Sequence, residues 1–331
     1  MKKIIFIIFM FMYLLNSCSK TAGPTQSLWQ AESLATATPS GQEWKELEVK
    51  SPFTPTMNFS CVEFQDKVWL IGGKADNCKN EIWYSNNFEK WSTSTASAEF
   101  PAREKQAVCV FNNKIWVIGG VSCKENKILS DIWASDNGLT FTVISENAPF
   151  GKLTGFNLFV FNEHLFLIAG NDGKEEKNDI WITKDGKEWK KHNTNPDTIF
   201  SPRANSSTAI YKNKIFLIAG EYKGQLLNDV WYSINGVDWE IITKNSSFKP
   251  RKNAILTVFG GRMWLIGGVK EKDEKIDIWC SDDGKNWKQI ETKKIPDNLK
   301  GYNIISYRDR MWLLGGIENN KELKNNIWST K

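Results

Sequence analysis

The chain has 331 residues, of which 41% are hydrophobic and 24% are charged, and its formal net charge is +5. This balance excludes an intrinsically disordered chain, and because no stretch concentrates the basic excess we expect no nucleic-acid partner. The sequence also contains 16 Trp but only two His, so any interpretation has to account for the tryptophans.

Residues 1–17 are predicted to be a signal peptide. Lys2 and Lys3 precede an apolar run over residues 4–15, which is shorter than the roughly 20 residues that a membrane-spanning helix requires. The segment Leu15-Asn16-Ser17-Cys18 resembles a bacterial lipobox, in which the cysteine is lipidated and becomes the mature N-terminus. An ordinary signal peptide with an incidental Cys18 is the alternative.

Residues 18–42 are predicted to be the lipidated cysteine and a flexible tether. The stretch from 19 to 42 is rich in Ser, Thr, Ala, Pro, Gly and Gln, a composition that cannot bury enough apolar surface to fold alone. We therefore expect residues 43–331 to form a domain outside the cytoplasm, held at a bacterial cell envelope through the lipid anchor only.

From residue 43 onward one unit of about 48 residues recurs six times, each with a small-residue pair, then a tryptophan behind a short apolar residue. In five units another aromatic follows that tryptophan eight residues later. The small pairs begin at residues 72, 119, 169, 219, 267 and 315, and the tryptophans are Trp83, Trp133, Trp181, Trp231, Trp279 and Trp328. Each unit reads as four short strands, and short strands repeated at this spacing are typical of propeller blades.

Four repeats place Asn-Gly or Asp-Gly after the third strand, at 137–138, 185–186, 235–236 and 283–284. Such pairs favour two-residue hairpin turns, in which both central residues have positive φ. The first repeat has Asn87-Phe88 in this slot, so we expect a different turn there.

These motifs together resemble the kelch repeat, including the central domain of galactose oxidase, and the resemblance covers residues 44–331. It implies an all-β fold, a six-bladed β-propeller of four-stranded antiparallel blades. The sixth unit ends at Lys331 without a fourth strand, whereas residues 43–49 look like a fourth strand without a blade. We predict that this N-terminal strand completes the C-terminal blade and removes the exposed edges of the ring.

The chemistry of known enzymes with this fold is missing from the sequence. Galactose oxidase requires histidine and tyrosine ligands for copper, but His164 is predicted in a hairpin turn and His192 in an outermost strand. We therefore expect no metal site, no cofactor and no catalytic residue.

Cys78 and Cys123 fall in equivalent loops of adjacent repeats, which makes them the candidate disulfide pair. Cys61, Cys109 and Cys280 are interpreted as small buried hydrophobic residues.

Loops that enter the first strand and loops that leave the second strand of each blade emerge on one face, around the central channel. The candidate ligand-binding residues in the entering loops are Arg103, Arg203, Arg251, Asn58, Asn205 and Asn253, with Lys105 in the same slot as the asparagines. Such a ring suits a carboxylate or a sugar acid, because guanidinium binds carboxylate through two hydrogen bonds. Alternatively, the arginines cap or bridge neighbouring blades, as the proline-arginine pair does in kelch repeats.

The function expected from these features is a tethered binding or protein-interaction module without catalysis, monomeric, with a protein or carbohydrate ligand. The alternative is a periplasmic sugar-acid enzyme similar to the kelch-type N-acetylneuraminate epimerase. Its carboxylate would be Glu63, Glu104 or Asp297, the acids near first strands. Glu63 stands out because other repeats have Val, Ile or Ser there, and a buried glutamate needs a partner or a raised pKa.

Overall fold

The computed structural model describes residues 43–48, 51–192, 199–271, 275–292 and 294–330, and their regular structure is entirely β. Within these ranges no helix is long and apolar enough to cross a membrane. The signal peptide and the tether predicted for residues 1–42 lie outside the described residues.

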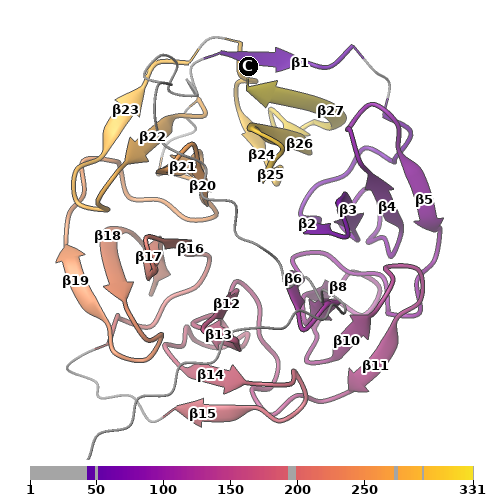
Figure 1. Ribbon diagram of the computed structural model, residues 1–331, viewed down its shortest axis with the longest axis horizontal. Coiled ribbons are helices and arrows are strands. Elements are labelled where there is room, and N and C mark those ends of the chain that lie inside the picture. The colour runs from indigo at the N-terminus through magenta and orange to yellow at the C-terminus, as the bar shows by residue number, and fades with distance from the viewer. Residues whose placement is uncertain (1–42, 49–50, 193–198, 272–274, 293, 331) are drawn as a thin grey trace, which may run out of the picture. The chain divides into compact units, whose positions relative to one another are not determined.

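Six antiparallel sheets form a ring of blades, which confirms the predicted six-bladed propeller (Figure 1). The strands of blade 1 are β2 (Ser60–Phe64), β3 (Lys67–Ile71), β4 (Ile82–Ser85) and β5 (Ser92–Thr95). Those of blade 2 are β6 (Ala107–Phe111), β7 (Lys114–Ile118), β10 (Ile132–Ser135) and β11 (Thr142–Ser145), with β8 (Val121–Ser122) and β9 (Lys127–Ile128) as a small separate hairpin.

The next three blades repeat this order from the centre of the ring outward. Blade 3 consists of β12 (Asn157–Phe161), β13 (His164–Ile168), β14 (Ile180–Thr183) and β15 (Lys190–His192), and blade 4 of β16 (Ser207–Tyr211), β17 (Lys214–Tyr222), β18 (Gln225–Ser233) and β19 (Glu240–Thr243). Blade 5 consists of β20 (Ile255–Phe259), β21 (Arg262–Ile266), β22 (Ile278–Ser281) and β23 (Lys288–Ile290).

Blade 6 is assembled from both ends of the propeller domain. Its strands are β25 (Asn303–Tyr307), β26 (Arg310–Glu318), β27 (Glu322–Thr330) and β1 (Trp44–Glu46), with β24 (Leu299–Lys300) paired to the end of β26. The N-terminal strand β1 pairs antiparallel with β27, in the register that places Trp44 opposite Thr330. The predicted closure by the N-terminal strand is confirmed, and it leaves no blade short of an outer strand.

The apolar core lies between blades. Six clusters of buried side chains each combine residues of two neighbouring blades. The tryptophans in the second strands, in β1 and directly before the other fourth strands are all less than a tenth exposed: Trp44, Trp69, Trp91, Trp116, Trp189, Trp239, Trp264, Trp287 and Trp312. Because a buried aromatic ring contributes 150–250 Å² of contact, these residues hold the ring of blades together.

The turns after the third strands differ from the sequence prediction. Positive φ occurs at the glycine of each pair, as at Gly138 (φ 72°), but not at the preceding Asn or Asp. The Ser135 hydroxyl accepts a hydrogen bond from Gly138 N at 2.8 Å, and the Asn137 carboxamide oxygen accepts two more from Leu139 N and Thr140 N. The side chains therefore bind the backbone N–H groups of a wider turn, and the predicted two-residue hairpin turn is wrong here.

Two-residue turns with positive φ at both central positions are instead found between the first and second strands. The pairs are Gln65-Asp66, Asn112-Asn113, Asn162-Glu163, Lys212-Asn213, Gly260-Gly261 and Arg308-Asp309. Only one of the six pairs is glycine, so the sequence signal for this turn type was weak.

The expectation of a different turn at Asn87-Phe88 is also wrong. Ser85 and Asn87 make the same hydrogen bonds to the backbone as their counterparts in other blades, and Phe88 occupies the glycine slot with φ 64°. Its ring stacks on Trp312 of blade 6, with centroids 3.9 Å apart and planes within 5°. The turn therefore has the same geometry as in the other blades, while the Phe88 side chain packs against blade 6 where the ring closes.

We expect Trp44→Ala to lower the melting temperature by about 5–10 °C, because loss of a buried tryptophan costs about 3–5 kcal/mol. Lys45→Ala is the matched control, since Lys45 is exposed in the same strand and should leave the transition nearly unchanged. Thermal denaturation followed by circular dichroism measures both. Equal melting temperatures for the two variants would show that closure by β1 contributes little.

Candidate functional site

The entrance to the channel is built on six equivalent residues in left-handed backbone conformation, each two positions before an innermost strand. They are Asn58, Lys105, Gly155, Asn205, Asn253 and Gly301, with φ between 54° and 65°. Glycine and asparagine adopt this conformation at least cost, so five of the six residues suit the backbone that the slot requires.

Backbone hydrogen bonds link these residues around the entrance. Lys105 N donates to Asn58 O at 2.9 Å, and Asn58 N donates to Gly301 O at 2.8 Å across the closure of the ring. On the opposite side Asn253 N donates to Asn205 O, and Asn205 N to Gly155 O. The entrance is thus fixed by the main chain, which leaves the side chains available for other contacts.

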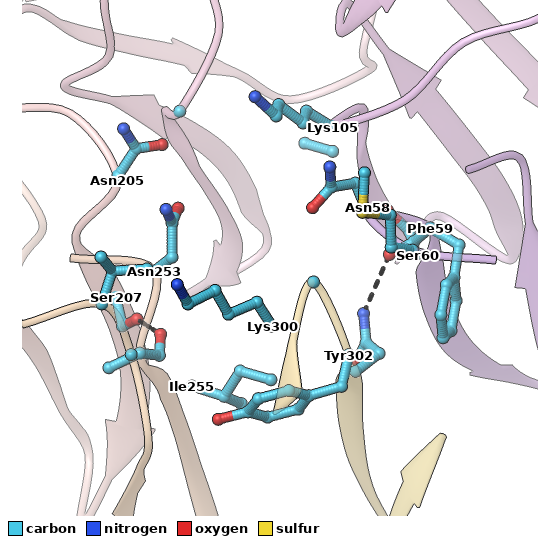
Figure 2. Close-up of a pocket in the computed structure, with 18 of the residues that line it drawn as sticks. Asn58, Phe59, Ser60, Lys105, Asn205, Ser207, Asn253, Ile255, Lys300 and Tyr302 are labelled. Atoms are coloured by element: carbon cyan, nitrogen blue, oxygen red, sulfur yellow. Dashed lines mark hydrogen bonds between the residues drawn. The ribbon is translucent and has the colours of Figure 1, made fainter. Parts of the chain in front are cut away.

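A cavity of about 670 Å³ opens at this entrance. Its polar lining consists mostly of amides and hydroxyls, with two lysines, and none of the described residues that line it is Asp, Glu or Arg. Figure 2 shows Asn205 and Asn253 on one side of the opening, Asn58 and Lys105 on the other, and Lys300 extending toward Asn253. The cavity therefore presents hydrogen-bonding groups and positive charge to whatever enters it.

Two of the asparagines are oriented by carboxylates just outside the cavity. Asn58 Nδ2 donates to Glu104 Oε2 at 2.7 Å, and Glu104 lies 3.7 Å from Lys74 Nζ. Asn205 Nδ2 donates to Glu221 Oε1 at 2.7 Å.

Lys252 Nζ contacts Glu221 Oε2 at 2.6 Å, so each of the two carboxylates has a lysine partner. The acidic charge beside the entrance is therefore already paired, while the exposed Lys105 side chain remains on the cavity wall.

The three predicted arginines lie inside the blades and do not line the cavity. Arg103 is 0% exposed, and its guanidinium donates to both carboxylate oxygens of Asp131 at 2.7 Å and to Gly119 O. Arg203 with Asp229 and Arg251 with Asp277 repeat this arrangement. A ligand-binding role for the arginines does not fit this placement, because their hydrogen-bonding groups are occupied and buried.

The contacts of these arginines match the alternative interpretation, in which they bridge blades. The Arg103 side chain binds its own blade, while Arg103 O accepts a hydrogen bond from Gly73 N of blade 1 and Arg103 N donates to Lys79 O of blade 1. Each arginine therefore connects the entering loop of one blade to the sheet of that blade and to the preceding one.

The Arg251–Asp277 pair shows the electrostatic balance of these contacts. Burial alone would raise the pKa of Asp277, but the hydrogen bonds and charge of Arg251, with Trp279 and Lys270, lower it to about 2. The carboxylate is thus held ionised, because a buried guanidinium without its counter-ion would be costly.

In two of the remaining blades the acid before the third strand has a different partner. In blade 3 the arginine slot holds the buried Leu153, and Asp179 pairs instead with Lys191 of the outer strand at 2.8 Å. In blade 1 the Thr54 hydroxyl lies 3.4 Å from Glu81. The arginine is therefore one of several ways of satisfying the third-strand acid.

The three acids considered for an enzyme are not brought together. Glu63 is exposed rather than buried, and it lines a separate cavity of about 310 Å³ with Ser306 and Arg308. Asp297 is half exposed and pairs with Lys275 at 2.7 Å. None of Glu63, Glu104 and Asp297 lines the entrance cavity.

The cysteines are partly as expected. The structure joins Cys78 to Cys123 in a disulfide, with their Cα atoms 5.4 Å apart. Cys109 and Cys280 are buried thiols, and burial raises the pKa of Cys280. Cys61 differs from the prediction, because it is only partly buried and lies in the cavity wall.

We expect Asp277→Asn to lower the free energy of unfolding at pH 7 by about 3 kcal/mol, because it leaves Arg251 buried without a counter-charge. The pKa of Asp277 is lower in the folded chain than the unfolded value of about 3.9, so the stabilisation from its ionisation is complete above that pH and disappears as the pH falls toward 2. Urea unfolding at pH 7, 5 and 3 should therefore show the two proteins converging in acid.

Asp282→Asn is the matched control for that comparison. Asp282 pairs with Arg262 on the surface, where its side chain is 62% exposed, and such pairs contribute about 0.2–1 kcal/mol. A gap between wild type and Asp277→Asn that stays constant from pH 7 to pH 3 would contradict the assigned role of the ionised carboxylate.

The comparison with known families agrees with this geometry. The family described as the KLHDC2/KLHL20/DRC7 Kelch-repeats domain matches residues 58–251 and 155–330. A search of curated proteins finds no match to the chain. The two overlapping matches cover most of the propeller, and the chain belongs to the kelch-repeat family.

Proposed function

We propose that this protein is a binding module that takes a carboxylate-bearing ligand, protein or carbohydrate, at the entrance of its channel. The observation that carries the proposal is the cavity of about 670 Å³, whose described lining includes two lysines and several amides and hydroxyls but no acid. A kelch propeller is a scaffold suited to interaction with partners, and its loops present variable side chains on a rigid frame.

The composition of the cavity favours binding over catalysis. General acid–base chemistry needs a group that titrates near the working pH. The titratable groups of the described lining are Lys105, Lys300, Cys61 and Tyr302, and burial raises the pKa of Tyr302 further from neutrality. Among the described residues that line the cavity there is no carboxylate to act as a base, so an epimerase-like reaction has no support.

Negative charge on the ligand is favoured by the electrostatics of the entrance. Glu104 and Glu221 are paired with lysines outside the cavity, so the exposed Lys105 adds positive charge that these acids do not offset. Asn253 is exposed on the opposite side of the opening and can donate and accept hydrogen bonds. This combination of a lysine and an amide can bind both carboxylate oxygens and sugar hydroxyls.

The test is titration calorimetry with an oligogalacturonate and with an oligoglutamate peptide, each against its methyl-esterified, uncharged counterpart. We expect at least one acidic probe to bind more tightly than its ester, and the affinity to fall as salt is added. Lys105→Met should weaken binding about fivefold, as expected for loss of one exposed charge contact.

Two further variants test the amide side chain and control for the loss of charge. Asn253→Gly removes the amide but keeps the left-handed backbone that Gly155 and Gly301 adopt in the same slot, so a loss of affinity reports the side chain. Lys285→Met, on an exposed turn at the periphery, is the control for loss of charge alone. Unchanged affinity in Lys105→Met and Asn253→Gly, or equal binding of acid and ester, would refute a charged ligand at this entrance.

We also propose that the module is anchored outside the cytoplasm of a bacterial cell by lipidation of Cys18 and acts as a monomer. The support is the sequence Leu15-Asn16-Ser17-Cys18 behind a short apolar run, followed by a tether. Growth with a labelled fatty acid should label the wild-type chain and not Cys18→Ala. An unlabelled wild type would contradict the anchor and leave the binding proposal to be judged on calorimetry.

A further inference from the structure

The disulfide between Cys78 and Cys123 lies against a buried carboxylate. Cys78 belongs to the loop between β3 and β4 of blade 1, Cys123 follows β8 of blade 2, and Glu104 belongs to the segment that enters β6. One Glu104 oxygen and the two sulfurs all lie within 4.8 Å of one another. Among the described residues this is the one group of three or more His, Cys, Asp and Glu side chains with such spacing.

The carboxylate of this group is held by partners of its own. Glu104 is 7% exposed, and Asn58 Nδ2 donates to its Oε2 at 2.7 Å. Lys74 Nζ lies 3.7 Å from Oε1. Outer partners of this kind orient the carboxylates that bind metal ions and raise metal affinity.

The two loops are also held together without the disulfide. Glu104 N donates to Val121 O at 3.0 Å and Val121 N to Glu104 O at 2.8 Å, which fixes the strand that leads to Cys123. Arg103 N donates to Lys79 O at 3.0 Å, directly after Cys78. These backbone bonds would keep both thiols near Glu104 after reduction.

We propose that reduction of this disulfide creates a metal site in which Cys78, Cys123 and Glu104 bind Zn²⁺ or a similar ion, with a water in the fourth position. A dithiol reductant supplies two electrons and two protons, becomes a disulfide itself and leaves two thiols on the protein. Binding of the ion then releases both protons, because the thiolate is the ligand.

The charges and dimensions suit this assignment. Two thiolates and one carboxylate carry −3, so Zn²⁺ leaves −1, which the adjacent Lys74 balances. In a tetrahedral site with Zn–S near 2.3 Å, two sulfurs lie about 3.8 Å apart. Cα atoms 5.4 Å apart permit that separation through side-chain rotation. The disulfide and the metal are thus alternative links between blades 1 and 2.

The experiment uses the full chain in two states, with the disulfide intact and after reduction with a water-soluble phosphine. The phosphine takes up oxygen from water to give its oxide, and the protein gains two thiols. Co²⁺ is the probe, since thiolate ligands give it a charge-transfer absorption and tetrahedral geometry gives strong visible bands. We expect one equivalent to bind to the reduced chain and to be displaced by Zn²⁺.

The oxidised chain is the first control, because it keeps Cys61, Cys109 and Cys280 as thiols and should give no such absorption. In the reduced state Cys78→Ser/Cys123→Ser should abolish the absorption, and Glu104→Gln should weaken Co²⁺ binding about tenfold or more. Glu221→Gln is the matched control, because Glu221 of blade 4 also accepts a 2.7 Å hydrogen bond from an asparagine of the entrance, Asn205, and it should leave Co²⁺ affinity unchanged.

Stability gives a second readout that does not depend on the absorption. Zn²⁺ should raise the melting temperature of the reduced chain by several degrees and leave that of the oxidised chain unchanged, because an ion that binds only the folded state stabilises it. A reduced chain that shows neither the absorption nor the shift overturns the site. An absorption retained without Cys78 and Cys123, or an affinity unchanged in Glu104→Gln, overturns the assigned ligands.

Discussion

Packing of an aromatic ring from one blade on the turn glycine of the next is the contact on which the ring of blades depends. A side chain added to Gly138, Gly186 or Gly236 would overlap the ring of Trp69, Trp116 or Phe166 in the preceding blade. Glycine is therefore required at these turns for close approach as well as for positive φ. At the closure the relation is kept by different means, because Phe88 takes the glycine slot and stacks flat on Trp312. With Gly284 against Phe216, the contact recurs at five blade interfaces and sets the spacing of the blades there.

The entrance to the channel follows from this regular spacing. Because every blade has the same relation to the next, the left-handed residue of one blade can donate a backbone hydrogen bond to the equivalent residue of the neighbouring blade, as Lys105 N does to Asn58 O. Because the main chain makes these bonds, they do not depend on the side chain in the slot, which can therefore differ between blades. The result is an asymmetric set of amides and one lysine on a nearly symmetric frame.

Most of the fold could be predicted from the sequence because the repeat recurs six times and Trp44 supplies the strand that the last unit lacks. The turn types could not, because side chains such as Ser135 and Asn137 satisfy a wider turn that Asn-Gly statistics do not distinguish. The location of the candidate binding residues could be predicted only in part. Asn58, Asn205 and Asn253 line the cavity, whereas the arginines beside them are buried. An available signal was the acid two residues before the third-strand tryptophan, because in blade 2 this acid is Asp131, which Arg103 binds through two hydrogen bonds. The signal is incomplete, however, since blade 3 has the acid without the arginine.

Glu104 shows how one blade departs from the repeat without disturbing it. Its backbone makes the two hydrogen bonds to Val121 that the neutral Ala204 makes to Glu221 in blade 4, so the scaffold demands no carboxylate in this slot. The carboxylate nevertheless lies 7% exposed between the Asn58 amide and the Cys78–Cys123 disulfide. Burying a carboxylate is unfavourable unless polar partners compensate, and here Asn58 and Lys74 do so. Glu104 therefore connects the cavity wall, through Asn58, to the two loops that Cys78 and Cys123 join. In this part of the blade the repeat itself requires only backbone hydrogen bonds.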